Sequence, residues 1–173
     1  MLKDLNTSGS TGEELRQEVQ LACFKVGDEL YALDIMKIKE IIRPQKLTPV
    51  PKSLSFIEGV INLRGVVIPV ADMRKRFDQP VTEQTRKNRI VVCALAGRII
   101  GLLVDEVTEV RRYARHEISP APQFVKGPQA AYFLGVARSG EDLIMLIDLE
   151  QVLSSDEKLE LETFDDDNRL PGH

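Results

Sequence analysis

Side chains suited to catalysis are sparse in this sequence. Its 173 residues include only two histidines, His116 and His173, and two cysteines, Cys23 and Cys93. A histidine-centred triad or a multi-histidine metal site needs more such groups. The glycines of 8–12 lie in a polar segment with no strand before it, unlike a phosphate-binding loop. Carboxylates are plentiful, but no spacing among them indicates acid–base catalysis. We therefore predict that the protein is not an enzyme and holds no metal or cofactor.

Composition predicts a folded domain built largely from strands. Apolar residues make up 43% of the chain and aromatic residues 5%, with no tryptophan, which favours an aliphatic core of Val, Ile and Leu. The longest apolar run, residues 90–97, is far shorter than the roughly 20 residues that span a bilayer. The N-terminus lacks the apolar segment of a secretory signal, so we expect a cytoplasmic protein that does not insert into membranes.

The charges are unevenly distributed. The net charge is −4, yet seven acidic residues and one lysine crowd into residues 156–167. The rest of the chain is close to balanced and carries no broad basic surface. This pattern predicts neither a nucleic-acid partner nor binding to an anionic membrane.

The chain repeats itself in three blocks that follow one another in the same order. Residues 30–43 match residues 99–112 at an offset of 69, in polar as well as apolar positions. Residues 47–51, with two prolines, match 118–122 at an offset of 71, and residues 56–73 match 132–149 at an offset of 76. A duplicated unit explains such matches better than a chance likeness of strand-rich segments.

Each repeat predicts about five short strands joined by tight turns. A first strand precedes a glycine turn, at Gly27 or Gly97, and the second strand is followed by a helical turn and a third strand. After the prolines comes a strand pair, around Arg64-Gly65 in the first half, and then an N-cap at Asp72 or Asp148. Strands of this number and length are typical of a small barrel, and two such barrels would stabilise each other by packing together.

These elements predict a mainly β protein with four segments. We expect a flexible N-terminal tail at 1–18, a first five-stranded barrel at 19–86, and a second, pseudo-symmetric barrel at 87–153. Short helical turns connect the strands. A C-terminal helix and acidic tail are expected at 154–173.

The chain resembles the CheW-like coupling proteins of bacterial chemotaxis over roughly residues 19–153. The resemblance implies a non-enzymatic adaptor made of two SH3-like β-barrels. It rests on six motifs: residues 27–35 (GDELYALDI), 38–41 (IKEI), 56–65 (FIEGVINLRG), 68–74 (IPVADMR), 101–107 (GLLVDEV) and 120–122 (PAP).

The resemblance also implies partners and contact residues. One surface would bind the regulatory domain of a CheA-type histidine kinase, and another the cytoplasmic tip of a methyl-accepting chemoreceptor. Such an adaptor would be recruited to membrane receptor arrays and would act in two-component signal transduction. The positions matching receptor contacts are Ile38, Glu40, Arg64, Val107 and Val110. Those matching kinase contacts are Ile42, Pro44, Leu47 and Phe124.

Other interpretations stay open at this point. Arg64 is also a plausible solvated turn residue, and Val107, Val110 and Phe124 are plausible core residues. The adaptor could serve a gliding, pilus or gene-regulation pathway instead of a flagellar one. An SH3-like peptide or nucleic-acid binder is a further alternative, supported by the basic runs 74–76 and 86–89. No aromatic residues are interleaved with those charges to stack on bases, which argues against nucleic acid.

Overall fold

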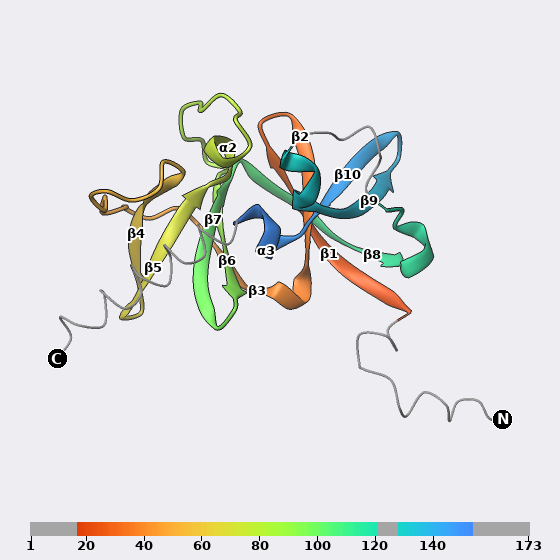
Figure 1. Ribbon diagram of the computed structural model, residues 1–173, viewed down its shortest axis with the longest axis horizontal. Coiled ribbons are helices and arrows are strands. Elements are labelled where there is room, and N and C mark those ends of the chain that lie inside the picture. Colours follow the sequence, from red (N-terminus) through yellow and green to blue (C-terminus); the bar gives the residue numbers. More distant parts are fainter. Residues whose placement is uncertain (1–16, 121–127, 154–173) are drawn as a thin grey trace.

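The computed structural model describes residues 17–120 and 128–153, which form ten strands and a few short helices (Figure 1). The strands are β1 (Glu18–Val26), β2 (Glu29–Asp34), β3 (Ile38–Ile42), β4 (Ile57–Leu63), β5 (Val66–Asp72), β6 (Arg89–Leu95), β7 (Arg98–Val104), β8 (Glu106–Ala114), β9 (Phe133–Ser139) and β10 (Asp142–Ile147). The helical elements are η2 (Ile35–Lys37), α2 (Met73–Arg76), η3 (Arg115–Glu117), η4 (Pro128–Tyr132) and α3 (Leu149–Val152). Phe124 and the helix and tail expected at 154–173 lie outside the described residues.

The strands form two five-stranded sheets, in agreement with the predicted fold class. Sheet A has the order β8-β1-β2-β10-β9, and sheet B has the order β3-β6-β7-β5-β4. Sheet B lies on the left of Figure 1 and sheet A on the right, with α3 between them. Each sheet contains one parallel pair, β2 with β10 in sheet A and β5 with β7 in sheet B.

The expected division of the chain at residues 86 and 87 does not separate the two sheets. The hairpin β1–β2 from the first half pairs with β8 and β10 from the second half, and β6–β7 pairs with β3 and β5. Each sheet therefore combines strands from both halves. The division was wrong because similar halves offer each strand two chemically similar partners, and the pattern of residues does not distinguish them.

The duplication itself is confirmed by matched hydrogen bonds. The backbone N–H of Asp72 donates to Phe56 O at 2.7 Å, and that of Asp148 donates to Tyr132 O at 2.7 Å. Both aspartates also cap the short helices that follow them, α2 and α3. Renaming each strand as its counterpart in the other half converts the order of sheet A into that of sheet B. The two halves are thus related by a pseudo-two-fold exchange.

Each sheet curls back on itself but is closed by a single bridge rather than a full strand ladder. Thr48, beyond the end of β3, pairs with Val60 of β4, and Ser119 pairs with Val136 of β9 in the same way. A glycine precedes each bridge because the backbones come very close. A Cβ on Gly59 would lie 2.4 Å from Thr48 O, and one on Gly135 would lie 2.5 Å from Ser119 O. The predicted equivalence of Gly59 and Gly135 follows from this shared contact.

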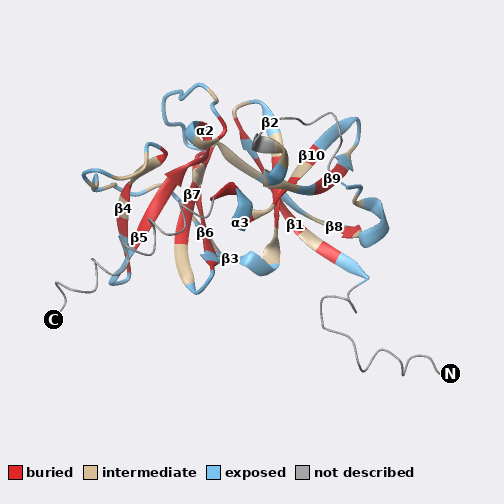
Figure 2. Ribbon diagram, viewed as in Figure 1, coloured by how far each residue is buried: buried red, intermediate tan, exposed pale blue. Residues whose placement is uncertain are grey.

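The buried residues of the described chain, red in Figure 2, include three apolar clusters. One belongs to sheet A and includes Leu21 and Ile144, and one belongs to sheet B and includes Ile68 and Ile90. The largest lies between the sheets, and we call it the junction core. It contains residues of both sheets and of both short α-helices: Phe24, Val26, Tyr31, Leu33, Phe56, Ala71, Met73, Phe77, Val91, Cys93, Leu95, Ile100, Leu102, Val104, Ile147, Leu149, Val152 and Leu153.

Most aromatic residues of the described chain lie at this junction. Tyr31 stacks on Phe77, with ring centroids 4.7 Å apart, and Phe133 lies 6.0 Å from Tyr31. The guanidinium of Arg76 lies 5.0 Å from the centre of the Phe56 ring and 4.8 Å from that of Tyr132, its counterpart. Arg76 Nε also donates to the carbonyl of Val152 at 2.7 Å. Since Arg76 and Val152 are equivalent positions, the pseudo-two-fold axis passes close to this contact.

A largely buried ionic cluster of Asp72, Arg74 and Asp105 links the two sheets. Arg74, 6% exposed, pairs with Asp72 through Nη2 and Oδ2 at 3.0 Å, and its Nη1 lies 3.5 Å from Asp105 Oδ1. Asp105 Oδ2 accepts a hydrogen bond from the Gly27 N–H at 2.6 Å. Asp105 stands where the chain crosses from sheet B to sheet A, so the cluster joins the β1–β2 turn of sheet A to α2 of sheet B.

We expect Arg74→Met to destabilise the protein by about 3–5 kcal/mol, because it leaves the buried carboxylate of Asp72 and the partly buried one of Asp105 without their cation. Urea unfolding followed by circular dichroism measures the loss. The matched control is Lys75→Met, whose side chain is 40% exposed and pairs with Glu58. That variant should change the free energy of unfolding by less than about 1 kcal/mol. Equal effects of the two variants would show that the buried cluster does not hold the sheets together.

We expect Gly135→Ala to cost about 3 kcal/mol in the same assay, because its Cβ would clash with the Ser119 carbonyl, a backbone group, as well as with the Ile118 side chain. Gly97→Asn is the control. Gly97 has open space around it and a φ of 79°, which asparagine tolerates. A Gly135→Ala variant as stable as the control would contradict the need for close approach at the bridge.

Candidate protein-interaction surface

The turn between β4 and β5 presents an arginine in an unusual backbone conformation. Arg64 and Gly65 are its two central residues, with φ angles of 51° and 88°. Positive φ at both positions suits the right-handed twist of a hairpin and normally selects Asn, Asp or Gly. The Asn62 side chain supports the turn by accepting the Gly65 N–H at 2.8 Å. An arginine side chain that is 68% exposed thus projects from a tightly held turn.

Arg64 forms an ion pair with Glu40 of β3. The strands β3 and β4 are opposite edges of sheet B, so this pair spans the gap beside the Thr48–Val60 bridge. Sheet A has a different link in the corresponding place, where Arg111 of β8 donates to Ser139 Oγ at 2.7 Å. The structure therefore brings together two of the predicted receptor contacts, Glu40 and Arg64.

Exposed apolar side chains occur on the strands that carry this pair. Ile41 of β3 is 39% exposed, and Val66 and Val67 at the start of β5 are 50% and 38% exposed. A shallow depression lies alongside. It is lined by Gln45, Lys46, Thr48, Val60, Ile61, Asn62 and Val67. Such an open, partly apolar surface suits contact with another protein rather than enclosure of a small molecule.

The other predicted receptor contacts are placed differently. Ile38 of β3 and Val107 of β8 are equivalent positions, and both pack against the junction core. Only the portion of each side chain that remains exposed is open to contact by another protein. Val110 of β8 is 50% exposed and lies on sheet A, not on the sheet that carries Arg64.

The predicted kinase contacts are partly core residues. Ile42 and Leu47 pack against the core of sheet B. Pro44 is half-buried and lines a second shallow depression together with Arg43. Phe124 lies outside the described residues, so the structure does not place it.

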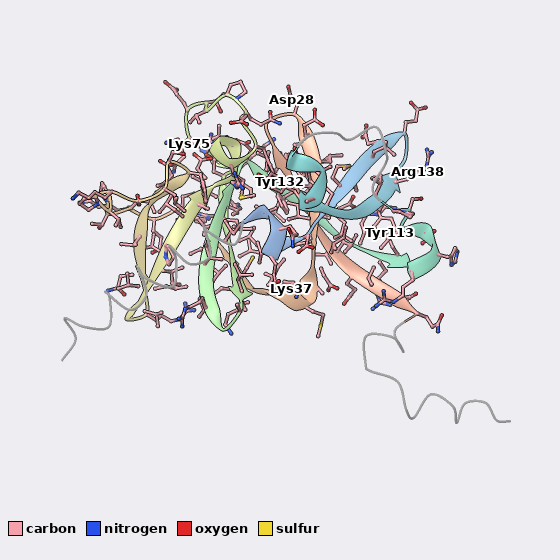
Figure 3. The ribbon with its side chains drawn as sticks, in the orientation of Figure 1. Asp28, Lys37, Lys75, Tyr113, Tyr132 and Arg138 are labelled. Carbon is pink, nitrogen blue, oxygen red and sulfur yellow. The ribbon has the colours of Figure 1, made fainter. Side chains whose placement is uncertain are left out.

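The basic run at 74–76 is engaged within the fold. Arg74 belongs to the buried ionic cluster, and Arg76 contacts two aromatic rings. Lys75 projects from α2 at the surface, whereas Tyr132 lies near the junction (Figure 3). This run therefore offers one exposed cation instead of three, which weakens the nucleic-acid alternative.

Burial shifts the pKa values of two cysteines and two tyrosines. Burial raises the pKa of the Cys23 thiol to about 11 and that of the Cys93 thiol to about 12. Burial is also the main cause of the raised pKa of Tyr31, about 12, and of the raised pKa of Tyr113. Within residues 17–120 and 128–153, no three metal-ligating side chains cluster, and no helix is long and apolar enough to cross a membrane.

Sequence reasoning missed two surface features. The exposure of Ile41 follows from alternation along β3, but the helical spacing of Ile35, Ile38 and Ile41 hid it. The second feature is a surface depression that Arg43, Arg86 and Arg89 line together. The pairing of β3 with β6 creates that depression, and the sequence alone does not reveal the pairing.

Known proteins similar to this chain share most of its length. A family model described as CheW-like domain matches residues 20–157. The chemotaxis protein CheW of Klebsiella aerogenes is 35% identical over 146 residues, which cover 84% of this chain and 87% of the relative. Protein FrzA of Myxococcus xanthus is 30% identical and covers 82% of this chain and 89% of its own. The crystal structure of scaffolding protein TtCheW from Thermoanaerobacter tengcongensis superimposes with a TM-score of 0.75 at 31% identity, covering 86% of this chain and 96% of that one.

The buried thiols predict slow reaction with Ellman's reagent. Because the raised pKa keeps each thiol protonated, the thiolate fraction of Cys23 at pH 8 is about 100-fold below that of an ordinary cysteine. We expect no colour in native buffer and two equivalents in guanidinium chloride. In the control Ala94→Cys, an exposed thiol next to Cys93 should react at once. Rapid reaction of the unaltered chain would contradict the burial of both thiols.

Proposed function

This chain belongs to the family of CheW-like domain proteins, and from that membership we propose that it couples the cytoplasmic tip of a chemoreceptor to the regulatory domain of a CheA-type histidine kinase. Membership of this family makes it a non-enzymatic chemotaxis scaffold. The named partners, and recruitment of the protein to membrane receptor arrays, are parts of the proposal. A receptor that changes shape would bias the kinase through differential contacts, with no chemistry on the adaptor.

The Arg64 turn is the observation that best supports a receptor contact. A left-handed backbone costs a non-glycine residue roughly 1–2 kcal/mol, and such a cost persists where the side chain has a task. An exposed ion pair adds at most about 1 kcal/mol of stability. Stability alone is thus a weak reason for an arginine here, whereas its guanidinium can bind carboxylates and carbonyls of a partner's helices.

A receptor tip would need apolar contacts as well as polar ones. Ile41, Val66 and Val67 supply exposed apolar area on the strands that carry Glu40 and Arg64. Val110 supplies a further exposed side chain on sheet A. Ile38 and Val107 would then hold the surface in place from beneath, because each packs on the junction core. An amphipathic helix binds such a surface with apolar side chains that are spaced three and four residues apart.

The proposed kinase-facing edge centres on Pro44. Ile42 and Leu47 pack inside sheet B, so we assign them to supporting the segment rather than to direct contact. Phe124 stays a proposed contact on the resemblance alone. A pathway other than flagellar motility is the second candidate, and similarity to protein FrzA keeps it open.

A pull-down with purified partners tests the proposal. The chain is incubated with a CheA-type regulatory domain and with a chemoreceptor tip, separately and together. Binding to both, and a ternary complex, are expected. Binding to neither would overturn the adaptor assignment for these partners and would direct attention to other signalling proteins.

Arg64→Glu should weaken binding to the receptor tip about tenfold, an increase in binding free energy of about 1.4 kcal/mol. Unfolding free energy should change by less than about 1 kcal/mol, because the side chain is mostly exposed. The control is Arg138→Glu, an exposed arginine near the equivalent hairpin of sheet A (Figure 3). Titration calorimetry measures binding in each case.

The double variant Glu40→Arg/Arg64→Glu, which exchanges the two charges, tests whether Arg64 contacts the receptor directly or only helps to hold sheet B closed. It retains an ion pair between β3 and the turn but reverses the charge offered to a partner. We expect binding to remain weak. Recovered binding would mean that the pair serves only to hold sheet B closed, and direct contact by Arg64 would be refuted.

A further inference from the structure

Two basic segments distant in sequence meet at one surface depression. It is lined by Arg43, Pro44, Gln84, Thr85, Arg86 and Arg89, and we call it the arginine depression. Strand β3 runs antiparallel to β6 with Ile42 opposite Ile90. The same register places Arg43, the next residue, across from Arg89. Arg86 comes from the loop that leads into β6.

No acidic side chain in the described ranges forms an ion pair with the arginines of this depression. Arg89 Nη1 donates to the carbonyls of Arg86 and Asn88, at 2.8 and 2.7 Å, which holds its guanidinium in place. Arg43 and Arg86 form no ion pair with any acidic side chain of the described residues. The nearest such pair in sequence, Lys87 with Glu106, has Nζ and Oε1 4.0 Å apart. Like charges facing each other across two strands repel, so an anion bound between them would be stabilised.

The same chain supplies a matching anion. Residues 156–167 hold seven carboxylates and a single lysine. The described chain stops at Leu153, directly after Val152, whose carbonyl is held by Arg76 of α2. The loop that carries Arg86 begins just after α2, so both segments leave the fold near the same helix. Twelve residues in extended conformation, counted from Leu153, span up to about 40 Å. Because the acidic segment is part of the same chain, its effective concentration at the depression reaches the millimolar range.

We propose that the acidic segment 156–167 binds the arginine depression of its own chain. The contact is electrostatic, through carboxylates on the guanidinium groups of Arg43 and Arg86, and it does not require a partner protein. Pro44 lines the depression and also lies on the proposed kinase-facing edge, so the bound segment would cover part of that edge. This last consequence rests on the proposed function, whereas binding of the segment does not.

Paramagnetic broadening in the full chain tests the contact. A nitroxide is attached at Glu160→Cys, because the native thiols are buried and their raised pKa keeps them unreactive at neutral pH. We expect the amide signals of Arg43, Thr85, Arg86 and Arg89 to lose intensity by about twofold or more against the reduced sample. They should recover in about 0.5 M NaCl, where exposed charges are screened.

Matched variants make the result decisive. Arg43→Ser/Arg86→Ser in the labelled chain should abolish the broadening, whereas Arg112→Ser/Arg138→Ser, which removes two exposed arginines of sheet A, should preserve it. Broadening that is absent, lies elsewhere or survives in the first variant would overturn the proposal. A mixture of isotope-labelled chain without nitroxide and nitroxide-labelled chain without isotope tests for contact between molecules. Equal broadening in this mixture would also overturn the proposal, because the contact would then lie between two copies. The kinase regulatory domain is then added to the labelled chain. Unchanged broadening would contradict the proposed kinase-facing edge at Pro44, but not the binding of the acidic segment to the arginine depression.

Discussion

The junction core is the constraint on which the structure depends. Central strands are buried on both faces, one towards the core of their own sheet and the other towards the junction. In β6, Ile90 and Val92 face the core of sheet B, and Val91 and Cys93 belong to the junction. This double burial explains why that strand reads as a continuous apolar run instead of an alternating one. The edge strands β3, β4, β8 and β9 lack it, and exposed side chains of the candidate surface lie on them, on their turns and at the start of β5.

Local features were predictable from the sequence because they depend on few neighbours. The hairpin at Arg64-Gly65, the caps at Asp72 and Asp148 and the short strands follow from turn and capping chemistry. The pairing of β2 with β10 was not predictable, because β5 offers a similar strand. The role of Arg74 was also not predictable. In the sequence Arg74 belongs to a basic run, and only the fold brings Asp105 beside it. For the candidate site, the family resemblance indicated Glu40 and Arg64, but only the pairing of strands joined them.

Function is expected where the two halves differ. The shared features, the glycine bridges, aspartate caps and aromatic pair Phe56 and Tyr132, all serve the fold. At the hairpins the halves diverge: one carries Arg64 paired with Glu40, and the other joins Arg111 to Ser139. Beside α2, Arg74 forms a buried ion pair, while its counterpart Glu150 is exposed. The pseudo-symmetry supplies a rigid frame, and the departures from it give each sheet its own surface.

The exchange of strands has a consequence for synthesis on the ribosome. Of the described strands, the hairpin β1–β2 emerges first, and β10, the parallel partner of β2, is made last, about 110 residues later. At roughly 5–20 residues per second, that interval lasts about 5–20 seconds. During it, β2 presents an unpaired edge and Tyr31 lacks its partner Phe133. Sheet B has all its strands once β7 has emerged, but sheet A cannot be completed before β8 to β10 leave the exit tunnel. The nascent chain must therefore avoid wrong pairings of β1 and β2 until β10 has been made.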